Sequence, residues 1–177
     1  MLHLVRHGRP LIDPARPADQ WPLDPDHADD VRRLRDAWAT GLPADAWWAS
    51  SAEPKAVATA QLLTGRTVEV EPDLGEHRRG AGWLDDVPAT VTRAFARPEE
   101  RAAPGWEPLA RCRARVVPAV RRILAERQGR EVVLVGHGTA WTVLVAALTG
   151  GPADLDRWRS LGMPDVVASL AVPTIIG

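Results

Sequence analysis

The chain has 177 residues and a formal net charge of −1, with 22 Lys and Arg residues against 23 Asp and Glu residues. A chain of this length fits one ordinary domain and can bury a sufficient core without disulfides. Its balanced charge provides no overall attraction for nucleic acid or for an anionic membrane, so we expect neither as a partner. Homo-oligomerisation is left open.

The cysteine content and the first residues indicate a cellular location. Cys112 is the only cysteine and cannot form a disulfide within the chain, which is typical of a reducing compartment. Charge arrives at Arg6, before any long apolar stretch, so no secretion signal is expected. No apolar run has the length of a membrane span. We therefore expect a cytoplasmic protein.

Short apolar runs alternate with amphipathic segments along the chain. In chain order, the patterns predict a strand at 2–5, a helix at 28–40, a strand at 46–49, a helix at 53–63, a strand at 67–70, a short helix at 90–97, a helix at 108–127, a strand at 132–135, a helix at 140–148 and a strand at 168–172. The first and fourth strands are almost wholly apolar, as central strands covered on both faces should be. This alternation predicts an α/β fold, a three-layer α/β/α sandwich with a mostly parallel central sheet.

We expect residues 1–177 to form a single domain. The segment 13–30 is rich in Pro and Asp and is predicted to be a loop. The segment 77–105 is predicted to be a short excursion over the active-site edge of the sheet and not a second domain.

Ligands of open α/β sheets bind outside the carboxyl ends of the strands, so the residues that follow each predicted strand are the candidate site. They are Arg6, His7 and Gly8 after the first strand, Ser50, Ser51 and Lys55 after the second, Asp73 and Glu76 after the third, and Gly136, His137 and Gly138 after the fourth. Two histidines, two cations and a carboxylate are thus expected to meet at one edge of the sheet.

This set of residues suits the binding and transfer of a phosphoryl group. Phosphoryl transfer needs mainly positioning and neutralisation of negative charge, which Arg6, Lys55 and a protonated His137 would supply. A neutral imidazole can attack phosphorus directly. The alternative is a metal site built on the two histidines and a carboxylate, but the neighbouring cations would repel a metal ion. We therefore expect no metal and no cofactor.

Four segments resemble the histidine phosphatase superfamily, which has a phosphoglycerate mutase-like fold. Residues 4–8 resemble the family's Arg-His-Gly signature, and residues 50–60 resemble its second phosphate-binding segment. Residues 74–76 resemble the segment that holds the acid/base carboxylate, and residues 133–138 resemble the segment of the second catalytic histidine. The four segments follow one another in the family's order.

The resemblance implies a role for each matching residue. His7 would be the phosphorylated nucleophile, and Glu76 would be the acid/base group, with a pKa raised toward the working pH. The catalytic set implied is Arg6, His7, Glu76 and His137, and the phosphate-binding set is Arg6, Gly8, Lys55, His137 and Gly138. Lys55 stands where the family usually carries arginine, which keeps the charge but loses the bidentate fork.

Several residues outside this set also carry predictions. His3 is expected to be structural, and His77 is expected either to orient Glu76 or to lie on the surface. Three tryptophans of the irregular segments are expected to shape the pocket mouth, namely Trp21, Trp83 and Trp106. The arginines of the 108–127 helix are expected to form a solvated face.

The resulting functional prediction is a metal-independent phosphomonoester hydrolase of the histidine acid phosphatase type, with a phosphohistidine intermediate on His7 and a small phosphorylated substrate. One alternative is a phosphomutase of the same fold, for which the 77–105 segment offers little lid. Another alternative is a catalytically weakened protein that only binds phosphate or a phosphopeptide. The residues do not identify the physiological substrate.

Overall fold

The computed structural model describes residues 1–38, 45–80 and 84–171. In chain order, its strands and α-helices are β1 (Leu2–Arg6), α1 (Ala28–Trp38), β2 (Trp47–Ser50), α2 (Pro54–Thr64), β3 (Glu69–Val70), α3 (Val87–Ala96), α4 (Leu109–Glu126), β4 (Val132–Gly136), α5 (Gly138–Thr149), α6 (Leu155–Ser160) and β5 (Asp165–Leu170). Three single 3-10 turns lie in the loops, namely η1 (Ala18–Gln20), η2 (Pro25–His27) and η3 (Pro72–Leu74).

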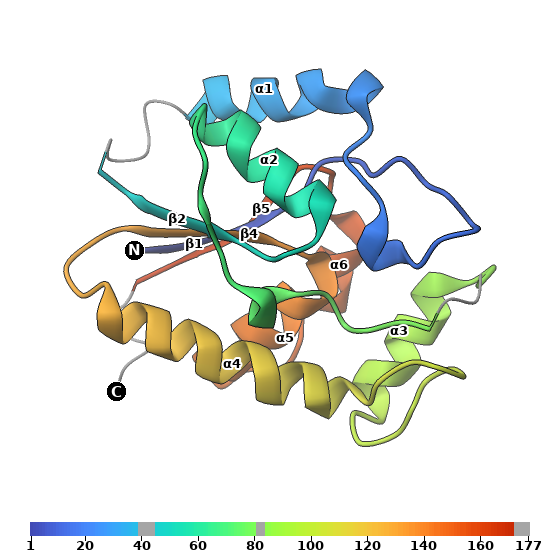
Figure 1. Cartoon of the computed structure of the whole chain (residues 1–177). Coiled ribbons are helices and arrows are strands. Elements are labelled where there is room, and N and C mark those ends of the chain that lie inside the picture. The colour runs from blue at the N-terminus through green and yellow to red at the C-terminus, as the bar shows by residue number, and fades with distance from the viewer. Residues whose placement is uncertain (39–44, 81–83, 172–177) are drawn as a thin grey trace.

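The strands form one five-stranded sheet in the order β3-β2-β4-β1-β5. The first four strands run parallel, whereas β5 pairs antiparallel with β1 at the edge. Helices α1 and α2 cover one face of the sheet, and α4 and α5 cover the other (Figure 1). The predicted three-layer α/β/α sandwich with a mostly parallel sheet is therefore confirmed.

The alternation of side chains along the central strands divides the core in two. Leu134 of β4 packs with the apolar residues of α4 and α5, whereas Val133 and Val135 pack with those of α1 and α2. All three side chains are fully buried, as expected of a strand covered on both faces. None of the helices in the described ranges combines the length and the apolar character that a bilayer crossing requires.

The observed elements differ from the predicted ones mainly at the margins of the sheet. The strand predicted at 168–172 begins three residues earlier, at Asp165, and residue 172 lies outside the described residues. The strand predicted at 67–70 is reduced to two residues. Helix α6 was not predicted, because it has only six residues and buries none of them fully. The predicted loop at 13–30 contains η1, η2 and the start of α1.

Candidate active site

His7 follows β1 at the carboxyl edge of the sheet, where its backbone N–H donates to the carbonyl of Gly136 at 2.9 Å. Its ring Nδ1 lies 2.6 Å from the carbonyl oxygen of Gly8. A carbonyl can only accept, so Nδ1 carries the proton and Nε2 keeps its lone pair. Burial, reinforced by the charges of His137 and Lys55, holds the pKa of His7 well below its usual value. His7 is therefore a neutral imidazole with one free nucleophilic nitrogen.

The structure shows a packing reason for glycine at position 8 that the sequence did not reveal. A Cβ at this position would lie 2.7 Å from Leu23 Cδ1 and 2.8 Å from Val31 Cγ2, so the chain can pass under α1 only without a side chain. The Gly8 backbone N–H donates to Thr59 Oγ1 at 2.9 Å, which ties this segment to α2. Both contacts fix the position of the preceding His7.

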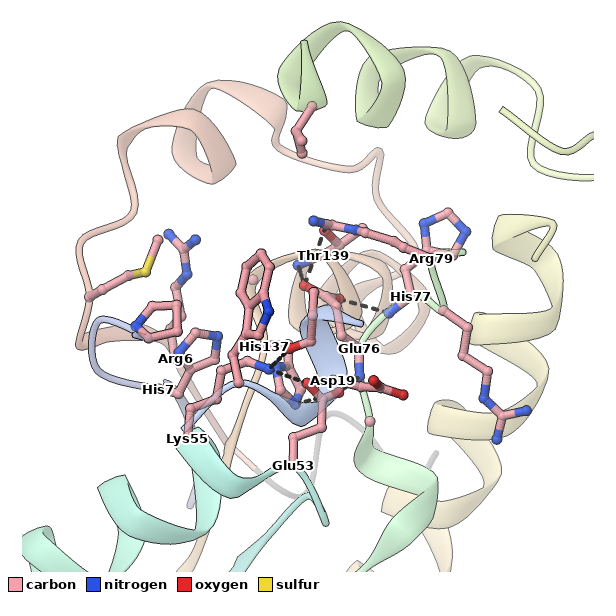
Figure 2. Close-up of a pocket in the computed structure, with 18 of the residues that line it drawn as sticks. Arg6, His7, Asp19, Glu53, Lys55, Glu76, His77, Arg79, His137 and Thr139 are labelled. Carbon is pink, nitrogen blue, oxygen red and sulfur yellow. Dashed lines mark hydrogen bonds and ion pairs between the residues drawn. The ribbon is translucent and has the colours of Figure 1, made fainter. Parts of the chain in front are cut away.

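His137 lies beside His7, with the two ring centroids 5.1 Å apart (Figure 2). Its Nε2 lies 2.7 Å from Ser51 Oγ and 3.1 Å from Glu53 Oε1. Its Nδ1 is buried and has no hydrogen-bond partner among the residues that the structure describes. Burial lowers the pKa of His137 to about 3, even though the Glu76 carboxylate acts in the opposite direction. The predicted protonated His137 is therefore corrected to a neutral imidazole at neutral pH.

Arg6, at the end of β1, directs part of its fork into the same pocket (Figure 2). Its Nη1 donates to the carbonyl oxygens of Leu161 and Gly162, at 2.8 and 3.4 Å. Its Nε is buried and without a partner within the described residues. Gly138 packs against the Arg6 guanidinium, because a Cβ at position 138 would lie 3.4 Å from Arg6 Nε. The guanidinium is thus oriented by the loop before β5 while Nε remains available to an anion.

Lys55 is buried at the start of α2, with only 5% of its surface exposed. Its Nζ donates to Glu53 Oε2 at 2.5 Å and to the carbonyl oxygen of Ala18 at 2.7 Å. Two of its three N–H bonds are therefore used within the protein, which leaves one for a phosphoryl oxygen. Glu53 was not among the predicted site residues, although its place two residues before the only lysine of the sequence was a usable signal.

Glu76 caps the N-terminus of α5 from a distant part of the chain. Its Oε1 accepts from the backbone N–H of Ala140 at 2.9 Å, and its Oε2 lies 3.3 Å from that of Thr139. The same Oε1 accepts from the backbone N–H of His77 at 2.9 Å. The positive end of the helix and these N–H groups favour a carboxylate over a carboxylic acid.

The pKa of Glu76 is the clearest departure from the sequence-based prediction. Burial by itself would raise this pKa, but the charges of Arg79 and His137 and the backbone N–H of His77 lower it to about 2. The expected upward shift is therefore wrong for the structure as it stands. The error has two sources: the approach of His137 depends on tertiary folding, whereas the effects of Arg79 and His77 come from the segment that holds Glu76 and were overlooked.

Arg115 of α4 holds the Glu76 segment in place. Its guanidinium donates to the backbone carbonyls of Asp73, Gly75 and Glu76 at 2.9–3.1 Å, and to Glu107 Oε1 at 3.0 Å. The prediction that the arginines of this helix are merely solvated is therefore wrong for Arg115, whose side chain is 12% exposed.

The remaining predictions divide between structural and pocket positions. His3 is buried and bonds Ser169 and Glu131 through its two ring nitrogens, as expected of a structural residue. His77 is also buried, so the surface alternative is wrong, and its Nε2 bonds the carbonyl oxygen of Glu107.

The predicted residues meet in one cavity of about 950 Å³. Of the predicted set, its lining contains Arg6, His7, Lys55, Glu76, His137 and Gly138, whereas Gly8 lies outside the lining. Trp21 lines this cavity, as predicted, and so does Trp158. Trp106 is instead buried, and Arg79 Cζ lies over its ring at 4.8 Å from the ring centroid. Trp83 lies outside the described residues.

A metal centre has no ready ligand set in this cavity. Within residues 1–38, 45–80 and 84–171, no three His, Cys, Asp or Glu side chains are grouped so that they could hold a metal ion. The two histidines instead share the cavity with Arg6, Lys55 and Arg79, which would repel a cation and attract an anion.

Comparison with solved structures finds this fold in several phosphatases. The mycobacterial glucosyl-3-phosphoglycerate phosphatase in complex with VO3 is 25% identical, with 91% of this chain and 86% of that chain covered and a TM-score of 0.70. A phosphoserine phosphatase from Entamoeba histolytica is 14% identical, with 94% of each chain covered and a TM-score of 0.68. Bacillus stearothermophilus YhfR is 24% identical, with 86% of this chain and 81% of that chain covered and a TM-score of 0.64.

No curated protein matches the sequence. The family model of the histidine phosphatase superfamily (branch 1), however, matches residues 2–172, nearly the whole chain. This match confirms the resemblance drawn from the four motif segments, and the fold agrees with it. The chain therefore belongs to the histidine phosphatase superfamily.

Proposed function

We propose that this chain is a metal-independent phosphomonoester hydrolase of the histidine acid phosphatase type, acting through a phosphohistidine on His7. The observation that carries the proposal is the state of His7, whose Nδ1–H is held by Gly8 so that the Nε2 lone pair is free. Arg6 and His137 line the same cavity as His7. The structural relatives include proteins named as phosphatases, which supports hydrolysis over other uses of the fold.

The proposed reaction has two steps. In the first, His7 Nε2 attacks phosphorus, the ester P–O bond breaks, and the leaving oxygen takes a proton from the Glu76 carboxyl group. In the second, Glu76 takes a proton from water, the water oxygen attacks phosphorus, and the P–N bond breaks. Glu76 must therefore gain a proton when the substrate binds. A phosphoryl dianion beside it favours that gain by like-charge repulsion.

A phosphate-release assay with p-nitrophenyl phosphate tests this function. We expect turnover that is unchanged by a chelator, because Arg6 and Lys55 already supply positive charge at the phosphoryl site. We also expect inhibition by orthovanadate, since the structure of the mycobacterial relative was solved in complex with VO3. Activity that disappears with chelator and returns with zinc or magnesium would overturn the proposal. Binding of the ester with no release of phosphate would identify a phosphate-binding protein instead.

The charge of Lys55 is expected to matter more than its identity. Lys55→Met keeps most of the side-chain stem but removes the charge, whereas Lys55→Arg keeps the charge. A charge-assisted hydrogen bond contributes about 1.5–3 kcal/mol, so kcat/KM for Lys55→Met should fall by roughly ten- to a hundred-fold. Lys55→Arg should stay within a few-fold of wild type. Circular dichroism on both variants separates this loss from unfolding, and an unimpaired Lys55→Met would show that the lysine serves only Glu53.

A further inference from the structure

The Glu53 carboxylate contacts both Lys55 and His137 (Figure 2). Its Oε2 accepts from Lys55 Nζ, and its Oε1 accepts from the backbone N–H of Glu76 at 2.8 Å. The same Oε1 lies 3.1 Å from His137 Nε2. The side chain is 11% exposed, so this negative charge stands inside a pocket that must bind an anion. A carboxylate at this position repels phosphate and weakens its binding, so we expect the residue to have a function that offsets this repulsion.

The surroundings of the two ring nitrogens of His137 suggest the function of Glu53. Nε2 faces Ser51 Oγ and Glu53 Oε1, whereas Nδ1 is buried without a partner in the described part of the chain. The ring lies beside His7, so an oxygen of a phosphoryl group on His7 can reach Nδ1. A neutral imidazole has a single N–H, and its two tautomers serve these neighbours differently.

While Glu53 is ionised, each neutral tautomer of His137 leaves one ring lone pair facing an anionic oxygen. With the proton on Nε2, the ring donates to Ser51 Oγ at 2.7 Å, but Nδ1 turns a lone pair toward a phosphoryl oxygen. With the proton on Nδ1, the ring donates to the phosphoryl oxygen and the Ser51 hydroxyl can donate to Nε2, but the Nε2 lone pair also lies 3.1 Å from a carboxylate oxygen of Glu53. One further proton resolves the conflict, either as an imidazolium or as a Glu53 carboxyl group that donates to Nε2.

We propose that Glu53 and His137 hold protons as a pair, and that a phosphoryl dianion is bound only when this pair gains one proton from solvent. Glu53 is thus a positioning residue that acts through His137. No covalent bond changes, and the proton added appears as Nδ1–H donating to the phosphoryl group. This inference rests on the phosphatase function proposed above.

The charged and titratable groups around the pair determine its state before the anion arrives. They are Arg6 and His7 from β1 and the residue after it, Lys55 from α2, and Glu76 and Arg79 from the segment after η3. Burial lowers the pKa of His137 to about 3 and raises that of Glu53 above its usual value. The N–H donors of Lys55 and Glu76 hold the free Glu53 as a carboxylate beside the neutral imidazole, so the extra proton has to enter together with the anion.

The variant Glu53→Gln tests the pair, because an amide NH₂ can donate to Nε2 while neutral His137 keeps its proton on Nδ1. Calorimetry of inorganic phosphate binding, in two buffers of different ionisation enthalpy, counts the protons taken up. At a pH where inorganic phosphate is the dianion, we expect wild type to take up about one proton more than Glu53→Gln, because any proton that Glu76 gains is taken up by both proteins. The surface variant Glu100→Gln removes an exposed carboxylate and should match wild type.

Three results would overturn the proposal for the Glu53–His137 pair: no proton uptake by wild type, equal uptake by both proteins, or no phosphate binding by an active wild type. A role limited to holding Lys55 would change affinity but leave the proton count unchanged. If Glu53→Gln does not fold, ¹⁵N NMR of the wild-type histidines with inorganic phosphate decides, since an Nε2–H neutral tautomer of His137 in the complex contradicts the proposal. Turnover of p-nitrophenyl phosphate by wild type tests the phosphatase function separately.

Discussion

His7→Ala is expected to abolish phosphate release while leaving the fold intact. The variant loses the nitrogen that would attack phosphorus, and the other cavity residues offer no replacement at the same position. We expect kcat to fall by about a thousand-fold or more. The variant loses the imidazole bond to the Gly8 carbonyl but keeps two backbone bonds of this corner, since Gly136 accepts from the backbone N–H of residue 7 and Thr59 accepts from that of Gly8.

Two measurements make this test specific for His7. His27→Ala removes a histidine that lies outside the cavity lining and should retain wild-type turnover, with circular dichroism confirming that both variants fold. In wild type or in a slow variant, ³¹P NMR should detect an acid-labile phosphoryl adduct on His7. A folded His7→Ala variant with near-normal activity, or an adduct on Ser50 or Ser51, contradicts the mechanism.

Glu76→Gln is expected to slow hydrolysis according to the leaving group. An alkyl phosphate needs a proton on its departing oxygen, and loss of a general acid costs on the order of a hundred- to ten-thousand-fold. The leaving group of p-nitrophenyl phosphate departs without that proton, so its first step should be affected far less. Water activation in the second step is impaired for both substrates, so phosphohistidine should accumulate with p-nitrophenyl phosphate.

Single-turnover measurements on the two substrates separate these steps. An equal loss of the first-step rate on both substrates would remove Glu76 from the role of proton donor. Glu53 would then be the better candidate, because burial raises its pKa whereas that of Glu76 is about 2. Asp73 is less suitable, since it is exposed and lies outside the cavity lining.

The low pKa of Glu76 also has a consequence for stability. A carboxylate whose folded pKa lies below its usual value of 4.5 stabilises the fold at higher pH, and this contribution is lost as pH falls toward about 2. The amide of Glu76→Gln does not titrate in this range, so the variant has no such contribution to lose as pH falls. The melting temperature of wild type should therefore fall more steeply than that of the variant across this acidic range.

The sequence predicted the parts of the molecule that depend on one strand at a time. Strands β1 and β4 were placed almost to the residue, because both are mostly apolar and lie in the interior of the sheet. Strand β5 was misplaced because it is a half-buried edge strand, in which Asp165 and Ser169 interrupt the apolar pattern. Arg6, His7 and His137 were found because parallel strands bring their carboxyl ends to one edge.

The missed residues act across separations that no local pattern records. Glu53 contacts His137 from a position 84 residues earlier in the chain (137 − 53), and Arg115 reaches carbonyls some 40 residues away. The pKa of Glu76 was predicted in the wrong direction partly for the same reason, because His137 approaches Glu76 only in the folded state, although Arg79 and His77 lie close to it in the sequence.

The packing around Gly8 separates two kinds of information within the Arg-His-Gly signature. Any side chain at this position would collide with Leu23 and with the stiff, fully buried Val31, whatever reaction the protein performs. A descendant of this chain that had lost its nucleophile would still need a glycine here to keep α1 seated on the sheet. The third position of the signature therefore reports the packing of the fold, whereas the arginine and the histidine before it report whether the chemistry has survived.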